Sequence, residues 1–182
     1  MNNNSDQNSN RNIWLSRRIG LPLLFLLLLI ADQVSKILVQ QYIPPGGERI
    51  HIIGNILNFV YIKNPYGAMG LKFGPPWVHM ITSALATLIV GYIFIRNWIR
   101  NDLAGLSSDI GMVMVLSGAV GNLLDKLLRG YVIDFIDIGF SHYRFWSFNI
   151  ADASITIGAI LWILPTVIHS QHKITENNQN LE

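Results

Sequence analysis

Residues 116–156 read LSGAVGNLLDKLLRG, then YVIDFIDIGFSHYRFW, then SFNIADASIT. This stretch sets carboxylates and amides into an apolar background, at Asn122, Asp125, Asp134, Asn149 and Asp152. A polar group held in or beside hydrocarbon costs free energy unless it has a partner, so such residues usually have a task. We therefore expect the rest of the chain to be arranged around this stretch.

The composition indicates a membrane protein. Of the 182 residues, 51% are hydrophobic and only 13% are charged, which suits several membrane spans in one domain better than a soluble domain. The formal net charge is +2 and the basic residues do not cluster, so nucleic-acid binding has no support. The chain has no cysteine, which excludes disulfides, a thiol nucleophile and a thiolate metal site.

Four apolar segments predict four transmembrane helices. They cover about residues 19–39, 77–95, 109–128 and 148–168. The polar residues 1–12 are expected to form a disordered N-terminal tail and residues 170–182 a polar C-terminal tail, which leaves residues 13–169 as one domain. The first apolar run also resembles a secretory signal peptide, but no small-residue cleavage site follows, so a retained span is favoured.

Two segments between the spans are expected at the membrane surface. Residues 40–75 contain two β-rich runs around Gly54-Asn55, a turn signal that predicts a small hairpin, and then the glycine-rich loop KNPYGAMGLKFG. Residues 131–148 are rich in aromatic side chains, as expected of an interfacial segment. The predicted fold class is therefore an all-α membrane protein, a bundle of four transmembrane helices with a small β-structure.

The polar residues of the spans are expected to meet at one side of the membrane. Successive spans cross in opposite directions, so both termini lie on one side and Asp32, Asp125 and Asp152 on the other. The segment with Asp134 opens on that side too. The 13 lysines and arginines divide almost evenly between the two sides, but the arginines close to the first two spans favour cytoplasmic termini.

Asp134 and Asp152 are the best candidates for a catalytic pair. Two carboxylates within hydrogen-bonding reach cannot easily both ionise, so one keeps a proton and acts as an acid while the other acts as a base. A water between them can be deprotonated as it attacks a peptide carbonyl, while the protonated partner donates to the developing oxyanion. A purely structural role is least convincing for Asp152, because no cation lies within a helical turn of it.

Structural roles compete for the other acids. Asp32 precedes Lys36 by four residues, the favourable spacing for a helical ion pair. Asp125 lies four residues before Arg129, so helix support is again the simpler interpretation. For Asp137, in the aromatic segment, solvation alone is a sufficient explanation.

Asn122 and Asn149 fit hydrogen bonds between helices as well as they fit a functional role.

Other chemistries have weaker support. Ser35 and Lys36 suggest a Ser–Lys hydrolase, but neighbours on a helix point about 100° apart and cannot form a dyad. The five histidines have no metal-ligand spacing, and the chain has no phosphate-binding loop.

The motifs GNLLDK, GYVIDF and FNIAD, with DQVSK at residues 32–36 and the NPYGAMG loop, resemble the lipoprotein signal peptidase family, bacterial membrane aspartic proteases also called signal peptidase II. The resemblance covers about residues 13–168. It implies four transmembrane helices, an extracytoplasmic β-cradle within residues 40–75 and a short interfacial helix. It also implies a multi-pass protein of the bacterial inner membrane, with the site at the extracytoplasmic face and the termini in the cytoplasm.

The resemblance assigns roles to individual residues. It makes Asp134 and Asp152 the catalytic dyad, which needs no metal or other cofactor. It implies substrate-binding roles for Asp32, Asn64, Asn122, Asp125, Lys126 and Asn149. The implied reaction removes the signal peptide from diacylglyceryl-modified prolipoproteins by cleavage before the lipidated cysteine, and the implied inhibitor is globomycin. We expect a monomer in contact with its substrate and with membrane lipid.

Two departures from the family pattern concern contacts rather than the dyad. The loop usually reads Asn-x-Gly-Ala-Ala-Phe, whereas Tyr66, Gly67 and Met69 replace its glycine, first alanine and phenylalanine. Lys126 replaces an arginine, and lysine lacks the planar fork that grips two acceptors. Substrate or inhibitor specificity can differ as a result.

Two alternatives to the protease remain open. One is a proton or ion pathway, which the position of the acids at span ends and the absence of an internal repeat disfavour. The other is a catalytically divergent relative that acts as a scaffold, which the altered loop keeps in consideration.

Overall fold

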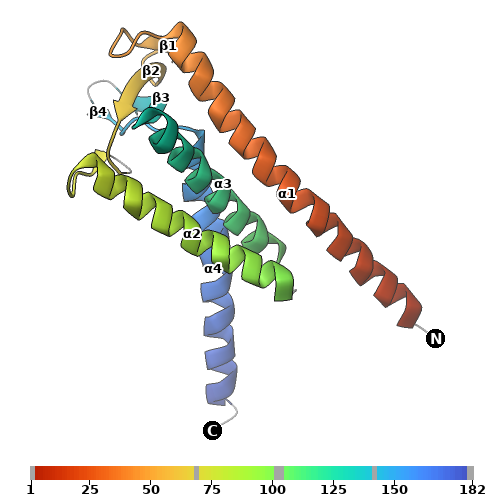
Figure 1. The fold of residues 1–182 in the computed structure, drawn as a ribbon. Helices are drawn as coiled ribbons and strands as arrows, with labels where there is room; N and C mark the ends of the chain where they lie inside the picture. The colour runs from red at the N-terminus through yellow and green to blue at the C-terminus, as the bar shows by residue number, and fades with distance from the viewer. Residues whose placement is uncertain (1–2, 68–69, 101–104, 141–142, 180–182) are drawn as a thin grey trace.

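The computed structural model describes residues 3–67, 70–100, 105–140 and 143–179. These residues form four helices and a small antiparallel sheet (Figure 1). In chain order the elements are α1 (Asn3–Tyr42), β1 (Ile50–Ile53), β2 (Leu57–Asn64), α2 (Pro76–Arg100), α3 (Leu106–Arg129), β3 (Val132–Phe140), β4 (Tyr143–Arg144) and α4 (Ile150–Gln179).

The helices confirm a multi-pass membrane fold. Within the described residues, Arg17–Tyr42 of α1, all of α2 and all of α3 are long and apolar enough to cross a membrane. The expected fourth span is a helix, α4, but its described apolar part is the shorter segment Ile150–Pro165. Large apolar side chains such as Leu27 and Leu88 are exposed on the outside of the bundle, as suits helices surrounded by lipid.

The first and last helices extend further than the sequence suggested. Residues 3–12 were expected in a disordered tail, but α1 already begins at Asn3. Similarly, α4 continues to Gln179, through most of the expected C-terminal tail. Once a helix is nucleated, each added residue gains a hydrogen bond without a new nucleation cost, which explains how polar residues can extend an apolar helix.

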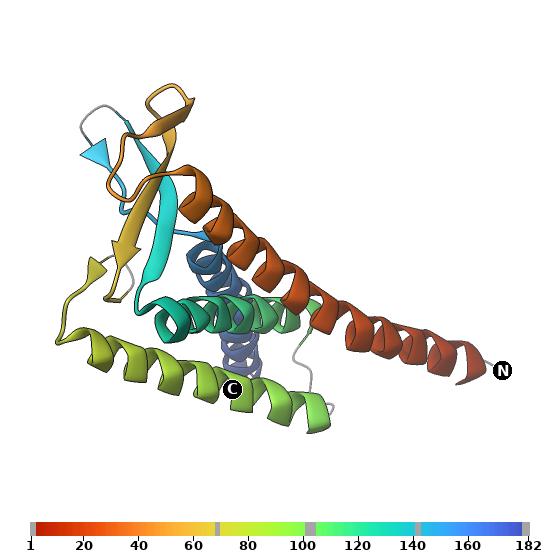
Figure 2. The same ribbon diagram turned by 45° about the horizontal axis from the view of Figure 1, so that its top comes forward.

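Helix α3 is the centre of the bundle. It contacts α1, α2 and α4, and Figures 1 and 2 show it between α1 and α2. Glycines bring α3 and α4 together: a Cβ added to Gly111 would lie 2.5 Å from the carbonyl oxygen of Gly158. Small residues allow such close backbone contact, which compensates for the weak hydrophobic attraction between helices inside a membrane.

The sheet lies at the end of the bundle where α1 ends (Figure 2). Its strand order is β1-β2-β3-β4, and β2 pairs antiparallel with β3, with Asn64 opposite Val132. The predicted hairpin is confirmed as β1 and β2 on either side of Gly54, which has a φ of 49°. The resemblance also implied a short interfacial helix, which the described residues do not contain beside α1 to α4; the described part of the aromatic segment 131–148 forms β3 and β4. Its β-branched and aromatic residues favour strands.

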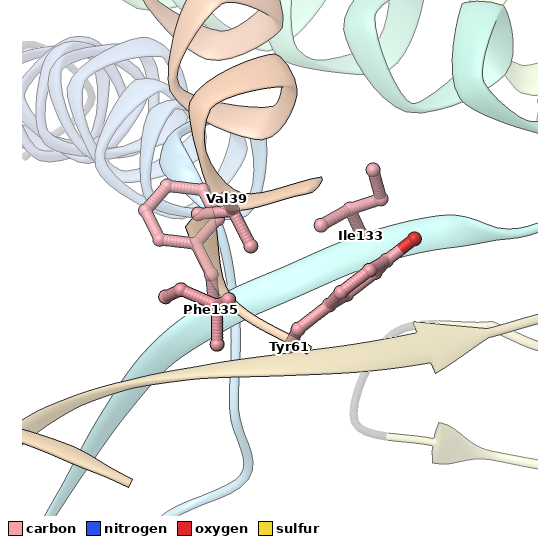
Figure 3. Packing of buried hydrophobic residues seen from close by; sticks show 5 residues of the cluster. Val39, Tyr61, Ile133 and Phe135 are labelled. Atoms are coloured by element: carbon pink, nitrogen blue, oxygen red, sulfur yellow. The ribbon is translucent and has the colours of Figure 1, made fainter. Parts of the chain in front are cut away.

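A hydrophobic cluster fixes β3 beneath the end of α1. Val39 of α1 packs with Tyr61 of β2 and with Ile133 and Phe135 of β3 (Figure 3). Burial of each such side chain contributes roughly 1.5–3 kcal/mol. Because successive side chains of a strand point to opposite faces, the packing of Ile133 and Phe135 turns Asp134 away from this cluster. The cluster therefore sets the direction of a candidate catalytic carboxylate.

Candidate active site

Asp134 is a buried carboxylate held by two amides. Asn64, at the end of β2, donates to its Oδ2 at 2.9 Å, and Asn149 donates to its Oδ1 at 2.9 Å. Burial, and then the nearby negative charge of Asp152, raise the pKa of Asp134 to about 7 against the two amide hydrogen bonds, which act in the opposite direction. This carboxyl therefore exchanges its proton near neutral pH.

Asp152 lies in the first turn of α4 and takes part in a reciprocal helix cap. Its backbone N–H donates to Oδ1 of Asn149 at 2.9 Å, and the backbone N–H of Asn149 donates to Oδ2 of Asp152 at 3.2 Å. This arrangement is a capping box, in which residues three apart satisfy each other's backbone. The other oxygen, Oδ1, accepts a hydrogen bond of 2.8 Å from Asn122. Asp152 thus has a structural role that sequence reasoning missed, although the spacing Asn149-x-x-Asp152 could have predicted it.

Asn149 fixes the two aspartates relative to each other. Its side chain is fully buried, and it contacts the backbone of Asp152 through Oδ1 and the carboxylate of Asp134 through Nδ2. Both aspartates line one cavity of about 180 Å³ between α2, α3, α4 and the sheet, which we call the helix cavity. Three other predicted site residues line it too: Asn64, Asn122 and Lys126.

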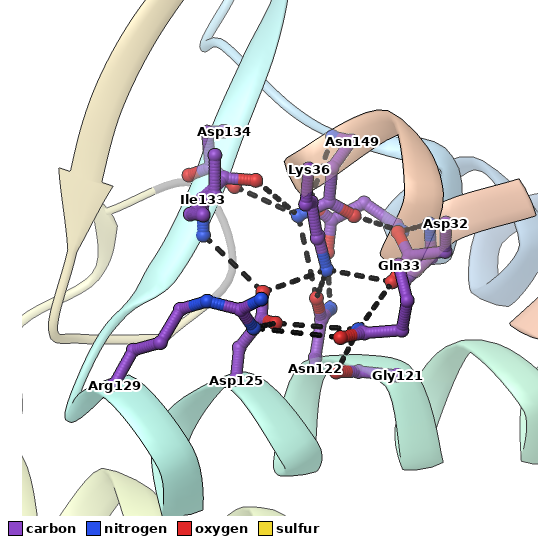
Figure 4. A network of polar contacts seen from close by, with 12 residues as sticks. Asp32, Gln33, Lys36, Gly121, Asn122, Asp125, Arg129, Ile133, Asp134 and Asn149 are labelled. Atoms are coloured by element: carbon purple, nitrogen blue, oxygen red, sulfur yellow. Dashed lines mark hydrogen bonds and ion pairs between the residues drawn. The ribbon is translucent and has the colours of Figure 1, made fainter. Parts of the chain in front are cut away.

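A network of charged side chains adjoins Asn122, which lines this cavity (Figure 4). Nζ of the fully buried Lys36 lies 2.8 Å from Oδ2 of Asp32 and 2.8 Å from Oδ2 of Asp125. It also donates to Oδ1 of Asn122 at 3.1 Å. Arg129 is 2.5 Å from the other oxygen of Asp125. The ion pairs expected from the helical spacing are therefore confirmed.

Asp32 and Asp125 support the site rather than line the helix cavity. They are only 2% and 0% exposed. Asp32 accepts from the backbone N–H of Ala151 at 2.9 Å, and Asp125 accepts from that of Ile133 at 3.3 Å. These contacts connect α1 to α4 and α3 to β3. Ala151 directly precedes Asp152 in the chain, and Ile133 directly precedes Asp134.

Lys126 brings a positive charge to the wall of the helix cavity. Its ammonium donates to the hydroxyl of Ser83 at 2.6 Å and to the carbonyl oxygen of His79 at 3.3 Å, which ties α3 to α2. Sequence reasoning missed α2 as part of this wall. Small neutral residues of an apolar helix give no signal of a site, yet three residues of α2 line the cavity: Ser83, Ala86 and Thr87.

Solvation does not explain Asp137. This carboxylate is 3% exposed and lies 2.8 Å from Nη2 of Arg144 and 3.0 Å from Nε of Arg49. Because Arg144 also donates to the carbonyl oxygen of Asn55 at 2.6 Å, the pair clamps the strands of the sheet together. In the NPYGAMG loop, Met69 lies outside the described residues, whereas Tyr66 and Gly67 line the helix cavity.

Comparison with known proteins agrees with this arrangement. Residues 24–168 match the family model described as signal peptidase (SPase) II. The chain belongs to the signal peptidase II family. It is 33% identical over 148 residues to the lipoprotein signal peptidase of Syntrophus aciditrophicus, covering 81% of this chain and 91% of that protein. It is 34% identical over 152 residues to the lipoprotein signal peptidase of Fusobacterium nucleatum, covering 82% of this chain and 87% of that protein.

A solved structure has the same fold. A bacterial membrane enzyme determined by the in meso method at 2.3 Å superposes with a TM-score of 0.74 at 31% sequence identity, covering 85% of this chain and 92% of that chain. A second such enzyme, at 1.9 Å, gives a TM-score of 0.65 and also 31% identity. This signal peptidase II is therefore an enzyme, a membrane-embedded peptidase.

Proposed function

We propose that this signal peptidase II is an aspartic endopeptidase in which Asp134 and Asp152 form the catalytic dyad. The observation that carries the proposal is their common position: both carboxylates line the helix cavity, and the buried Asn149 contacts both residues. We further propose that it removes the signal peptide from diacylglyceryl-modified prolipoproteins, cutting before the lipidated cysteine. The relatives named lipoprotein signal peptidase support this substrate.

In the proposed reaction the dyad holds one proton. Asp134, with a pKa of about 7, carries it in the resting enzyme. The charged form of Asp152 is favoured by the N-terminus of α4 and by the donors Asn122 and Asn149. Asp152 then takes a proton from water as the water oxygen attacks the peptide carbonyl carbon. Asp134 donates its proton to the carbonyl oxygen, which gives a neutral tetrahedral intermediate.

The second half of the reaction returns both protons. Asp152 gives the proton it took to the leaving nitrogen, and the C–N bond breaks. Asp134 takes back the hydroxyl proton as the carbonyl re-forms, so the dyad again holds one proton. The chain's own carboxylates complete this cycle.

The remaining predicted site residues have two proposed roles. Asn64, Asn122 and Lys126 line the helix cavity, so they can contact substrate, and the ammonium balances the single negative charge of the dyad. Asn149 is a positioning residue for both aspartates. Asp32 and Asp125 act through Lys36, which holds Asn122 against Asp152.

We also propose how the enzyme sits in the bacterial inner membrane. The sheet lies at one end of the bundle, and the N-terminal end of α1 and the C-terminal end of α4 point away from it (Figure 1). Asp134 belongs to this sheet, and Asp152 lies in the first turn of α4. With α4 as a fourth span, this arrangement supports a site and termini on opposite sides of the membrane, and the arginines close to the first two spans support cytoplasmic termini. We propose a monomer that works in contact with membrane lipid.

Purified enzyme tests the function directly. It is incubated with a diacylglyceryl-modified precursor and with the unlipidated form of the same precursor, each with and without globomycin. The proposal predicts cleavage of the lipidated precursor alone, before its cysteine, and inhibition by globomycin. Equal cleavage of both precursors, or of neither, would contradict it.

A further inference from the structure

Tyr66 lines two cavities, and both of them reach Asp134. One is the helix cavity. The other, about 230 Å³, opens at the sheet beside Lys63, Lys72 and Trp146, and we call it the sheet cavity. Three residues line both cavities: Asn64, Tyr66 and Asp134. We call these three residues the partition between the cavities, and Tyr66 has the largest side chain among them.

The Tyr66 ring is held on two sides. The ring of His79 meets it edge-on, with centroids 5.6 Å apart and planes at 77°. The ammonium of Lys72 lies 4.7 Å from its centroid, close enough for a cation–π interaction. His79 is itself fixed, because it is 1% exposed and packs 3.9 Å from the ring of Phe73. The position of the partition is therefore set by the surrounding structure.

The backbone of Tyr66 is connected to the catalytic carboxylate. Its N–H donates to Oδ1 of Asn64 at 3.0 Å, and Nδ2 of the same side chain donates to Asp134 at 2.9 Å. The side-chain amide of Asn64 thus holds both the backbone of Tyr66 and the carboxylate of Asp134. Tyr66 and Asp134 line the helix cavity together, so a substrate group that reaches Asp134 through this cavity meets Tyr66.

The rest of the helix cavity limits what can enter it. Its lining includes the small side chains of Ala86 and Ala119, and its volume of about 180 Å³ corresponds to an amino-acid side chain rather than to two acyl chains. A third, apolar cavity of about 310 Å³ reaches Asp152 along α4 and is lined by Phe145, Trp146 and Phe148. This apolar cavity suits the lipid on the cysteine.

We propose that Tyr66 is a specificity-determining residue: its clamped ring sets the largest side chain accepted immediately before the cleaved bond. The cysteine follows this bond and carries the lipid to the apolar cavity, so the helix cavity receives the residue on the amino side of the cut. This inference rests on the proposed function, and it concerns a position where the family resemblance expects glycine.

The test uses lipidated precursors that differ only in the residue before the cysteine, alanine or leucine. The ratio of kcat/KM for alanine to that for leucine is measured in the wild type, Tyr66→Ala and the matched control Tyr66→Phe. In Tyr66→Ala this ratio falls about tenfold or more, the effect of opening a pocket by several methylenes. In Tyr66→Phe the ring remains, so the wild-type ratio is retained. An unchanged ratio in Tyr66→Ala, or an equal change in Tyr66→Phe, would overturn the proposal.

Folding and function are separated by two further measurements. Thermal unfolding shows whether Tyr66→Ala is folded; if it is not, Tyr66→Leu replaces it, for which a smaller fall in the ratio is expected and an unchanged ratio counts against Tyr66. If the wild type cleaves neither precursor, the proposed function fails. If it cleaves them and the ratio does not depend on residue 66, only the role of Tyr66 fails.

Discussion

Two groups of carboxylates lie side by side in this enzyme, and they have different kinds of partner. Asp32 and Asp125 each lie 2.8 Å from the ammonium of Lys36. Asp134 and Asp152 accept hydrogen bonds from asparagines instead. A cation locks a carboxylate in its charged form, whereas a neutral amide leaves it free to exchange a proton. The partner of a buried acid, rather than its burial, therefore separates the supporting acids from the reactive ones.

Neutralising one acid from each group gives the largest expected contrast. Asp152→Asn keeps the size of the side chain and loses the base, so we expect kcat/KM to fall by about 10³-fold or more. Its amide accepts only one of the two hydrogen bonds that the carboxylate accepts, so we expect the free energy of unfolding to fall by about 1 kcal/mol. Asp32→Asn leaves the ammonium of Lys36 buried with one carboxylate fewer, so its main loss is in stability. Activity assays and thermal unfolding in the same detergent compare the two. If both variants lost the same activity and neither lost stability, Asp32 and Asp152 would not have the different roles proposed here.

Part of this contrast could be predicted from the sequence. The Asp32–Lys36 pair is local, since four residues on a helix bring the two side chains together. The second partner of Lys36, Asp125, comes from another helix 89 positions later in the numbering, and no local pattern reveals such a contact. For Asp134 and Asp152 the sequence predicted a common side of the membrane, but Asn149 as the residue that contacts both became visible only in the structure.

The errors have equally specific causes. The family resemblance implied a short interfacial helix, but the described part of the aromatic segment 131–148 forms strands, because β2 offers Val132 and its neighbours an edge to pair with. Asp137 looked solvated because Arg49 and Arg144, its ion-pair partners, are separated from it in the chain.

Removing the cation should have the second largest effect, on stability. Lys36→Met fills a similar volume but leaves Asp32 and Asp125 without their shared partner, and breaking a buried ion pair in this way costs about 3–5 kcal/mol. Lys63→Met, an exposed lysine, is the matched control and should change the free energy of unfolding little. Unfolding in detergent measures both. A loss for Lys36→Met no larger than for the control would mean that the network does not support the site.

A smaller and more specific effect is expected at Asn149. Asn149→Ser keeps a capping oxygen but loses the amide that donates to Asp134. We expect kcat/KM to fall roughly tenfold, the effect of one hydrogen bond to a charged group. The lost bond lowers the pKa of Asp134 in the wild type, so this pKa rises in the variant and the loss of activity at alkaline pH moves to higher pH.

Asn149→Ala is the control for the helix cap, because it loses both the amide and the capping oxygen. It should lower the free energy of unfolding by about 1 kcal/mol more than the serine variant. The pH profile of kcat/KM and thermal unfolding test these expectations. A pH profile of Asn149→Ser identical to that of the wild type would show that the amide does not control the proton of Asp134.

The central claim, that Asp134 and Asp152 share one proton, is tested most directly by titrating the carboxyl group of Asp134. Infrared spectroscopy follows the carboxyl band that is absent from Asp134→Asn, in the wild type and in Asp152→Asn. The account predicts a pKa of about 7 for Asp134 in the wild type and a lower pKa in Asp152→Asn, because the neighbouring charge is gone. A wild-type pKa near the ordinary value of 3.8, or the same pKa in both proteins, would contradict it.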